Sequence, residues 1–408
     1  MTIAERNKNL DKNPNLKPVK KVWLDPIAFS GYNGIENKPE TLCADDLLVW
    51  KGQELSQNFL RTISEDRRDE IAKSVYNYLY AYDWNEFHYN KVDVQRSFES
   101  LKKYKGSVEK KDGVLYLPNG GAGGYQIYRN FFPNIMKIND GKRPSVYDVV
   151  NNKEKLWATI RNRIGNTLLY NDDPNGVPVQ YPMNITLSQI LIGARNSGLA
   201  SMGSIFKPTV AKSIYTHWVK DGQNVLDYSC GFGTRLLGLL ATGMKAKYCG
   251  YEPNTETFCN LQNIIDYFKA DAEIKKSGSE VDDLFNDQFD FAFSSPPFFN
   301  AEIYCDEKTQ SCAKFPDYND WLEGYWHQTV LNVKKMLKPD GIFAVNVGGN
   351  GNAVMQQLDV DLNKIVVNSG FKLIDTWFMK TGRSHLSSTK GQKDTKIKLE
   401  GIFFYGIK

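Results

Sequence analysis

Asn224–Arg235 reads NVLDYSCGFGTR. It begins with a short apolar run of strand length that ends at the acidic Asp227. Gly231 and Gly233 then allow a sharp backbone turn into Arg235–Ala241, whose apolar residues have helical spacing. A strand, a glycine-rich turn and a helix in this order are typical of the first unit of a doubly wound α/β sheet, in which a ligand approaches the main chain at the carboxyl edge.

The residues that follow continue the alternation of strands and helices. Strands are predicted at Lys247–Glu252, Phe289–Ser294, Gly341–Val347, Phe371–Met379 and Gly401–Ile407, and helices at Thr255–Phe268 and 318–337. The last two strands are joined by a charged loop instead of a helix. We therefore expect an α/β fold with a mostly parallel, Rossmann-like sheet and an antiparallel last strand.

The N-terminal half is expected to form an α+β accessory domain. Helices are predicted at Glu65–Tyr82 and Ser145–Ile164, with short strands, turns and a glycine cluster at 120–124 between them. Phe206–Trp218 is predicted as a helix with Pro208 in its first turn, and it leads directly into the first strand of the sheet. We place the domain boundary near residue 195, with the accessory domain at 1–195 and the sheet domain at 196–408.

The composition is that of a soluble globular protein. Of 408 residues, 41% are apolar, 13% aromatic and 24% charged, which excludes disordered and fibrous classes. No stretch approaches the roughly eighteen apolar residues of a membrane span, and the polar start of the chain has no apolar signal core. We expect a cytoplasmic protein with no membrane association. The six cysteines form no C-x-x-C pair, so we expect reduced thiols and no metal site.

The formal charge of +4 is unevenly distributed. Between Thr376 and Lys398 there are six Lys/Arg against one acid, so the rest of the chain is close to neutral. Lys380, Arg383 and Lys390 are candidate phosphate contacts from this segment, and 96–111 is a second basic cluster. Such patches suit a polyanionic partner, although a solvated lysine-rich loop is an equally good interpretation.

A second acidic residue, Glu252, stands at the end of the second predicted strand. A doubly wound fold has a carboxylate there that accepts hydrogen bonds from a ribose diol. No Lys-Ser/Thr pair follows the glycines, so a Walker-type phosphate site is not supported. An adenosine without phosphates fits, such as S-adenosylmethionine (SAM), whose sulfonium would lie near acids such as Asp227. A tight turn without a ligand and a surface carboxylate are the alternatives to these two assignments.

Ser295-Pro296-Pro297-Phe298 follows the strand predicted at 289–294. Two prolines fix φ and remove two backbone donors, which leaves a rigid segment whose carbonyl groups are free to accept hydrogen bonds. The exocyclic amine of a base is a donor, so the Ser295 side chain and the Pro296 carbonyl could hold it while Phe298 stacks on the base. Alignment with a methyl donor would then be the main source of catalysis. A Pro-Pro turn after a core strand is the alternative.

VLDYSCGFGTR, GYE and SSPPFF, followed by LKPDGIFAVNVG, resemble the motifs of the DNA amino-methyltransferases, which make N6-methyladenine or N4-methylcytosine. The resemblance covers about Ser204 to Lys408, and it implies a SAM-dependent methyltransferase domain at 196–408. The roles that it implies are SAM binding for Asp227, Gly231 and Gly233, ribose binding for Glu252, and binding of the target base for Ser295, Pro296, Pro297 and Phe298. FKPTVAK is similar to the helix that closes over the methionine end of SAM in these enzymes, which implies cofactor contacts for Phe206 and Pro208.

The sequence departs from the family pattern in two places. Ser295 replaces the Asp or Asn common in adenine enzymes, and Ser is commoner in the cytosine-N4 branch, so the base stays open. Phe298 stands where Tyr is most usual and keeps the stacking face. No cysteine follows a proline as cytosine-C5 chemistry requires. Asn300, Glu302 and Tyr304 could border the base pocket, with an ordinary surface loop as the equal alternative.

The resemblance implies DNA as the partner, a flipped target base and a restriction–modification context, with the N-terminal domain helping to bind DNA. Three other functions remain open: an RNA base amino-methyltransferase, a protein-glutamine methyltransferase and a non-catalytic SAM-binding module. The sequence gives neither the recognition site nor whether a cognate nuclease exists, and it does not distinguish a monomer from a dimer. Trp321, Trp326 and His327 are at helical spacing, which favours core packing over ligand binding.

Overall fold

The computed structural model describes residues 21–23, 47–80, 92–106, 108–112, 114–117, 123–125, 127–165, 184–201, 203–282, 284–348, 357–380 and 399–408. These residues form two compact units. One unit takes those within 1–92 and 136–202, and the other takes those within 93–135, 203–384 and 394–408. The units interleave along the chain, because 93–135 packs with the sheet, whereas the sequence analysis proposed a single boundary near residue 195. The role of 1–195 as an accessory domain stays a prediction.

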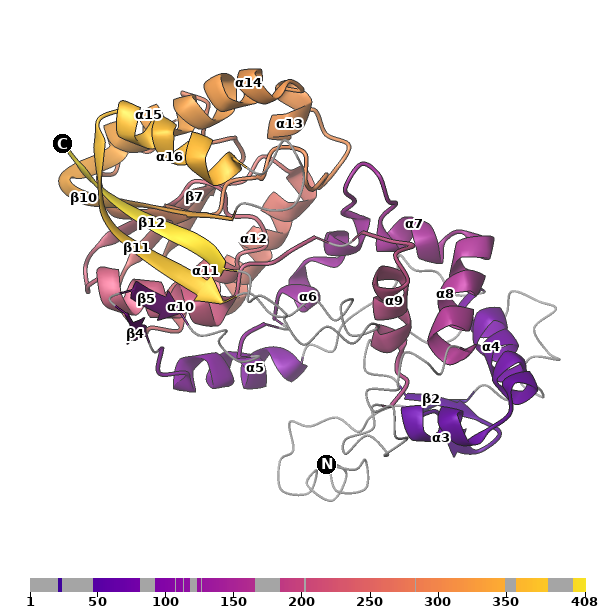
Figure 1. The fold of residues 1–408 in the computed structure, drawn as a ribbon. Helices are drawn as coiled ribbons and strands as arrows, with labels where there is room; N and C mark the ends of the chain where they lie inside the picture. Colours follow the sequence, from indigo (N-terminus) through magenta and orange to yellow (C-terminus); the bar gives the residue numbers. More distant parts are fainter. Residues whose placement is uncertain are drawn as a thin grey trace. The chain divides into compact units, whose positions relative to one another are not determined.

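The larger unit is built on a mixed sheet, whose described strands number nine (Figure 1). Their order is β4 (Glu109–Lys111), β5 (Val114–Leu117), β11 (Phe371–Lys380), β12 (Leu399–Ile407), β10 (Leu337–Val347), β9 (Phe289–Ser294), β6 (Asn224–Asp227), β7 (Lys247–Tyr251) and β8 (Ala272–Lys275). From β10 to β8 all neighbours are parallel, and β12 is antiparallel to both β10 and β11. The predicted Rossmann-like α/β fold, with its antiparallel last strand, is confirmed.

Helices cover both faces of this sheet (Figure 1). On one face lie α10 (Pro208–Trp218) and α11 (Thr234–Leu240), and on the other lie α14 (Tyr318–Trp321), the π-helical η4 (Leu322–His327), α15 (Gln328–Met336) and α16 (Leu358–Asn368). The unit also contains α5 (Val92–Lys103), α6 (Ile127–Phe131), α12 (Thr255–Phe268) and α13 (Ser311–Lys314), and η2 (Pro133–Lys137) follows α6. The helix predicted at 318–337 is the continuous run α14, η4 and α15. Neither α16 nor β8 was predicted.

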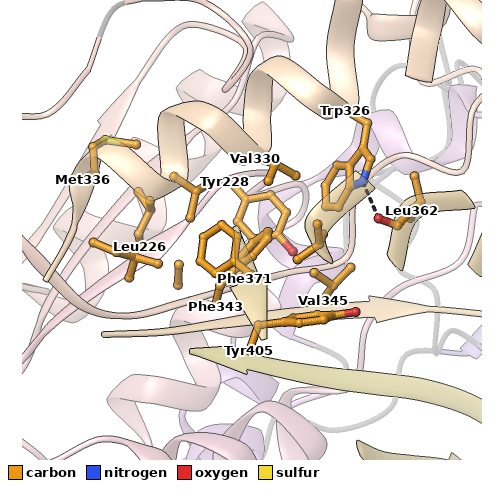
Figure 2. Packing of buried hydrophobic residues seen from close by; sticks show 14 of the residues in the cluster. Leu226, Tyr228, Trp326, Val330, Met336, Phe343, Val345, Leu362, Phe371 and Tyr405 are labelled. Atoms are coloured by element: carbon orange, nitrogen blue, oxygen red, sulfur yellow. Dashed lines mark hydrogen bonds between the residues drawn. The ribbon is translucent and has the colours of Figure 1, made fainter. Parts of the chain in front are cut away.

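One core of this unit lies between the sheet and the α15 face (Figure 2). Phe343 and Val345 of β10 pack there with Trp326 and Val330, and the Trp326 indole donates a hydrogen bond to the Leu362 carbonyl at 3.1 Å. Each large apolar side chain buried in this way contributes about 1.5–3 kcal/mol. As predicted, Trp321 and Trp326 are core residues. His327 instead makes a surface contact with Glu323 at 2.8 Å.

The opposite face of the sheet carries an aromatic layer. Tyr215 of α10 packs edge-on against Phe291 and Phe293 of β9, each at a ring distance of 6.0 Å. Trp218, the last residue of α10, stacks on Phe404 of β12 at 4.8 Å. These contacts fix α10 across strands near the centre of the sheet. Its first residue, Pro208, lies toward the carboxyl edge of the sheet, where the predicted site is.

The smaller unit has mixed secondary structure. Its described elements are β1 (Lys21–Trp23), β2 (Leu47–Trp50), β3 (Gln53–Glu54), α3 (Gln57–Thr62), α4 (Glu65–Tyr80), α7 (Val146–Val150), α8 (Lys153–Gly165) and α9 (Leu187–Asn196). The helix predicted at 145–164 is broken between α7 and α8. Ser145 and Asp148 form a capping box that starts α7. In the described part of the chain, every helix is too short or too polar to cross a membrane.

Gly238 tests the packing of α10 on α11. A Cβ added to Gly238 would lie 2.5 Å from the Ala211 Cβ and 2.9 Å from the Lys212 backbone nitrogen. Gly238→Ala must therefore push two helices apart, and we expect the free energy of unfolding to fall by about 1–3 kcal/mol in urea titrations. The control is Gly406→Ala, whose Cβ would meet only Ile374 at 3.8 Å. Equal stability of the two variants would contradict this packing.

Candidate active site at the carboxyl edge of the sheet

The predicted site residues leave the sheet at one edge. β6, β7, β9 and β10 are parallel, so the segments that follow Asp227, Tyr251, Ser294 and Val347 all begin at the carboxyl edge. The Ser294 hydroxyl donates to the Ser229 carbonyl at 3.1 Å. This bond joins the glycine-rich turn after β6 to the residue before Ser295–Phe298, which we call the proline corner. The two predicted motifs are therefore neighbours in space.

Asp227 is buried, and its carboxylate accepts hydrogen bonds from other side chains of the protein. It is 0% exposed, and its Oδ2 accepts a hydrogen bond from Arg235 Nε at 2.7 Å and another from the Tyr248 hydroxyl. Its Oδ1 accepts from the Ser229 backbone N–H at 3.1 Å. Through these hydrogen bonds, Asp227 fixes the backbone of the glycine-rich turn. The direct cofactor contact expected from the sequence stays a prediction.

Arg235 is the ion partner that the sequence analysis missed. Its side chain is 5% exposed, and besides Asp227 it donates to the Ser229 carbonyl. Burial is the largest single effect and lowers the pKa of Arg235, but the charge and hydrogen bond of Asp227 together with the neighbouring tyrosines raise this pKa above its ordinary value. The only sequence signal was an arginine inside the apolar helix TRLLGLL. The two opposite charges make the pair neutral as a unit.

The glycine-rich turn requires glycine at two positions. Gly231 has φ of 51° and Gly233 has φ of 65°, both in the left-handed region that side chains disfavour. A Cβ on Gly233 would also lie 2.9 Å from the Leu261 Cδ2 of α12. The backbone N–H of Gly231 donates to Glu252 Oε2 at 2.9 Å. The turn is consequently held against both α12 and the strand-end carboxyl group.

Glu252 is a buried carboxyl group with remaining capacity to accept hydrogen bonds. It is 7% exposed, and its two oxygens accept one backbone N–H each, from Gly231 and from Asn254, both at 2.9 Å. Burial raises its pKa to about 8, against the lowering effect of these two N–H groups. When ionised, the carboxylate has about four lone-pair sites and two are used by these N–H groups, so hydroxyl donors of a ligand can still bind.

The proline corner has a fixed hydrogen-bond polarity at Ser295. The Ser295 hydroxyl lies 2.8 Å from Asn346 Oδ1, and Asn346 Nδ2 donates to the Gly401 carbonyl at 3.2 Å. Because the Asn346 amide must use its NH2 group toward that carbonyl, its oxygen accepts the proton of Ser295. The lone pairs of Ser295 Oγ are then left for a ligand donor. Asn346, at the end of β10, is 2% exposed and was missed from the sequence.

The two phenylalanines after the prolines have different environments. Phe299 is buried, its φ of 51° is unusual for a residue with a side chain, and its ring packs on Tyr318 at 5.4 Å and on Trp321 at 5.7 Å. Strain of this kind costs about 1–3 kcal/mol and persists only where packing enforces it. Phe298 is half-buried and packs against the edge of the core. It is therefore the partly accessible aromatic ring of the pair.

The loop after Phe298 is hydrogen-bonded to the segment that precedes α10. Glu302 Oε1 accepts from the Ser204 backbone N–H at 2.6 Å and from its hydroxyl at 2.9 Å, while Oε2 accepts from the Tyr304 hydroxyl at 2.6 Å. Burial and the charge of Glu302 raise the pKa of Tyr304 far above its ordinary value. Asn300 is exposed. Glu302 and Tyr304 thus have partners within the chain, and a role toward a substrate stays a prediction for all three.

Phe206 lies beside Arg235, which holds the glycine-rich turn, and Pro208 lies beside α11. The Phe206 ring meets Phe293 of β9 edge-on at 5.5 Å, and the Arg235 guanidinium lies 5.8 Å from its centre. Pro208 is the buried first residue of α10. Residues that precede α10, the turn after β6 and the end of β9 therefore meet around Arg235.

Tyr325 brings η4 to the same region. Its hydroxyl lies 3.2 Å from Ser229 Oγ, and Ser229 belongs to the glycine-rich turn. Burial raises the pKa of Tyr325 above its ordinary value. The π-helical stretch adds one residue to a turn, a feature that often marks functional regions and has no sequence signature that we recognised.

The predicted basic patches are described only in part. Arg383 and Lys390 lie outside the described residues, and Lys380 is the last residue of β11, at the carboxyl edge. In the cluster at 96–111, the exposed basic residues on α5 and β4 and between them are Arg96, Lys102, Lys103, Lys105, Lys110 and Lys111. The larger unit thus carries basic side chains of its own outside 381–398.

One group of side chains has the composition of a metal site. The ligand atoms of Cys249, Glu273 and Asp287 lie within 4.8 Å of one another. The Lys247 ammonium lies 2.8 Å from Asp287 and 3.5 Å from Glu273, so a cation is already present there. The prediction that the protein needs no metal stays a prediction.

The solved structures that are similar to the chain match about half of it. No protein-family model matches the chain, and no curated protein matches it in sequence. Three solved structures are similar to it: a putative methyltransferase from Thermoplasma acidophilum (15% identity, 51% of this chain, 77% of that chain, TM-score 0.33), TrmN from Thermus thermophilus (14%, 53%, 53%, 0.36) and a precorrin-6y C5,15-methyltransferase from Geobacter metallireducens GS-15 (13%, 50%, 90%, 0.35). At these identities and scores the similarity assigns no substrate and no function.

The Asp227–Arg235 ion pair predicts a large asymmetry between single and double variants. Arg235→Met leaves a buried carboxylate without its cation, and the free energy of unfolding should fall by about 3–5 kcal/mol. Asp227→Asn combined with Arg235→Met removes the lone charge and should recover part of this loss. Urea unfolding of both variants measures the difference. If Arg235→Met is as stable as the wild type, the pair does not hold the turn.

The raised pKa of Glu252 predicts that the free energy of unfolding depends on pH. Its pKa is raised from 4.5 to about 8 in the folded protein, so the stability tied to the protonated carboxyl is fully present below the unfolded pKa and is lost as the pH rises through about 8. The free energy of unfolding without ligand should therefore decline between about pH 5 and pH 9. Glu252→Gln should make this decline shallower in urea titrations across the same range. Identical slopes for wild type and variant would refute the burial effect.

Proposed function

We propose that this protein is a SAM-dependent DNA methyltransferase that transfers a methyl group to an exocyclic amino nitrogen, N4 of cytosine or N6 of adenine. The observation that supports it most is the adjacency of two motifs. The glycine-rich turn is joined to the proline corner through the Ser294–Ser229 hydrogen bond of 3.1 Å. A cofactor at the turn and a base at the corner would therefore be neighbours, which methyl transfer requires.

The cofactor side of the proposal rests on hydrogen-bond capacity and shape. Gly231 and Gly233 place no side chain at their positions in the turn, and Glu252 as a carboxylate keeps lone pairs for a ribose diol. Phe206 and Pro208 would close the methionine end of the site. SAM, when bound, supplies an electrophilic methyl group on a sulfonium. Asp227 contributes indirectly, because its charge is matched by Arg235.

The base side of the proposal rests on acceptors. Since Ser295 gives its proton to Asn346, its oxygen can accept one N–H of an exocyclic amine. The Pro296 carbonyl, which receives no hydrogen bond among the described residues, can accept the other. Two acceptors orient the amine and raise the electron density on its nitrogen, while Phe298 stacks on the base. After methyl transfer the nitrogen loses a proton to water, so no strong general base is required.

DNA is the proposed substrate because of the basic side chains. Exposed lysines and one arginine on α5 and β4 belong to the same compact unit as the site, and a further basic segment follows Lys380. Phosphate contacts of this kind position a nucleic acid without reading its sequence. A base inside a duplex cannot reach the corner, so the enzyme would flip its target at a cost of a few kcal/mol.

The proposal is tested by methyl transfer from radiolabelled SAM to DNA and to RNA. Wild-type protein should label DNA, and the rate should fall by about a hundredfold or more in Ser295→Ala, because an acceptor of the amine is lost. His327→Ala, which changes a surface contact with Glu323, is the control and should keep the wild-type rate. Preferential labelling of RNA would replace DNA by RNA as the substrate. Unchanged turnover in Ser295→Ala combined with Phe298→Ala would refute the mechanism.

A second measurement identifies the base. The protein is expressed in a host that lacks DNA methylation, and the host genome is then sequenced by a modification-sensitive method. Methylated amino groups at a recurring sequence would name both the base and the recognition site. A genome without added methyl groups, from cells that contain folded protein, would argue against DNA as the substrate.

A further inference from the structure

A segment from the N-terminal half packs against the proposed cofactor site. It consists of α6 and the residues that follow, 127–134, and we call it the brace. It belongs to the same compact unit as the sheet, although about 90 residues of sequence separate it from β6. Its neighbours include Phe232 and Gly233 of the glycine-rich turn and Thr257 in the first turn of α12.

The first contact of the brace is with the glycine-rich turn. Phe132 is 0% exposed, and its ring meets the Phe232 ring edge-on at 5.3 Å and 84°. A Cβ added to Gly233 would lie 3.8 Å from the Phe132 Cζ. Phe132 therefore fills the space beside the left-handed Gly233. Edge-to-face pairs of this kind contribute beyond their buried area and fix orientation.

The second contact leads to the strand-end carboxyl group. Asn134 Nδ2 donates to Thr257 Oγ1 at 2.8 Å, inside the first turn of α12. The Thr257 backbone N–H donates to the Asn254 side chain at 2.7 Å, and the Asn254 backbone N–H donates to Glu252 at 2.9 Å. Asn134, Thr257 and Asn254 are all buried. A chain of buried hydrogen bonds thus connects the brace to the proposed ribose acceptor.

A third contact lies just before the brace. Gly124 has φ of 74°, and a Cβ there would lie 2.7 Å from the Leu101 Cδ2 and 3.2 Å from the Pro208 Cγ. The chain around the brace therefore approaches the start of α10 as well as the glycine-rich turn and the first turn of α12. The proposed function assigns the first two of these to SAM, and the first turn of α12 leads through Asn254 to Glu252.

We infer that Phe132 and Asn134 are positioning residues of the cofactor site, which hold the glycine-rich turn and Glu252 in the geometry that binds SAM. The inference rests on the proposed function for the identity of the ligand. Neither side chain is assigned a contact with SAM itself. The site is then incomplete without Phe132 and Asn134, and a chain that began near residue 195 would lack both.

The test compares two neighbouring phenylalanines. Phe132→Leu keeps an apolar side chain but loses the edge-on contact with Phe232, and we expect the Kd for SAM in calorimetry to rise about tenfold. Phe131→Leu is the matched control, because Phe131 packs on Tyr267 at 5.6 Å, near the far end of α12. It should bind SAM as the wild type does. In the methylation assay, Phe132→Leu should raise the KM for SAM and leave the KM for DNA unchanged.

Each outcome decides between the inference and the proposed function. Equal Kd values for Phe132→Leu and wild type would overturn the inference alone. A wild-type protein that does not bind SAM would overturn the proposed function, and the inference with it. A parallel rise of both KM values in Phe132→Leu would show general damage to the unit and would also overturn it.

A measurement on the wild type keeps the inference testable if Phe132→Leu does not fold. SAM binding should slow amide hydrogen exchange in 127–134 together with 229–233, because the two segments pack on each other. Slowing in 229–233 with no change in 127–134 would overturn the inference. Asn134→Ala, which removes the bond to Thr257 and little volume, should also weaken SAM binding.

Discussion

The ion pair of Asp227 and Arg235 is the interaction on which the site depends. Both charges are out of water, where an unpaired charge would cost several kcal/mol, so each requires the other. Because Arg235 also holds the Ser229 carbonyl, the pair fixes the path of the chain from the end of β6 into the glycine-rich turn. The turn in turn supplies the Gly231 N–H to Glu252 and the Ser229 carbonyl to Ser294. One buried pair therefore orients the residues proposed for the cofactor and the start of the corner proposed for the base.

Parallel strands bring these residues together from distant parts of the sequence. Each strand from β6 to β10 ends at the same edge, so short segments after Asp227, Tyr251 and Ser294 form one surface. The hydroxyl of Ser295 is given its polarity from two further strands, by Asn346 of β10 and the Gly401 carbonyl of β12. The brace, which comes from the N-terminal half of the sequence, packs against the glycine-rich turn. The binding of a base that is proposed for Ser295–Phe298 thus depends on residues from distant elements of the same unit.

The sequence predicted most of the sheet correctly, and its errors have physical causes. β6, β7, β9, β10, β11 and β12 were predicted because their apolar runs are local signals that a buried strand requires. β8 reads AEIK, which is too short and too polar to stand out, and the solvent-facing residues of α16 dilute its apolar spacing. The hairpin of β4 and β5 was expected in the N-terminal domain. It pairs with β11 instead, because an open sheet edge accepts any strand whose backbone can reach it.

For the candidate site, the sequence determined which residues stand at strand ends and turns: Asp227, the two glycines, Glu252 and the Ser-Pro-Pro-Phe corner. These positions follow from local rules, since proline and glycine set backbone angles wherever they occur. Only the tertiary structure decided the partners of these residues. In the folded chain Asp227 pairs with Arg235, the Ser295 hydroxyl donates to Asn346, and Phe132 packs on Phe232. Such pairs form between residues 8 to 100 positions apart, and a single sequence contains no signal for contacts that arise only when elements pack.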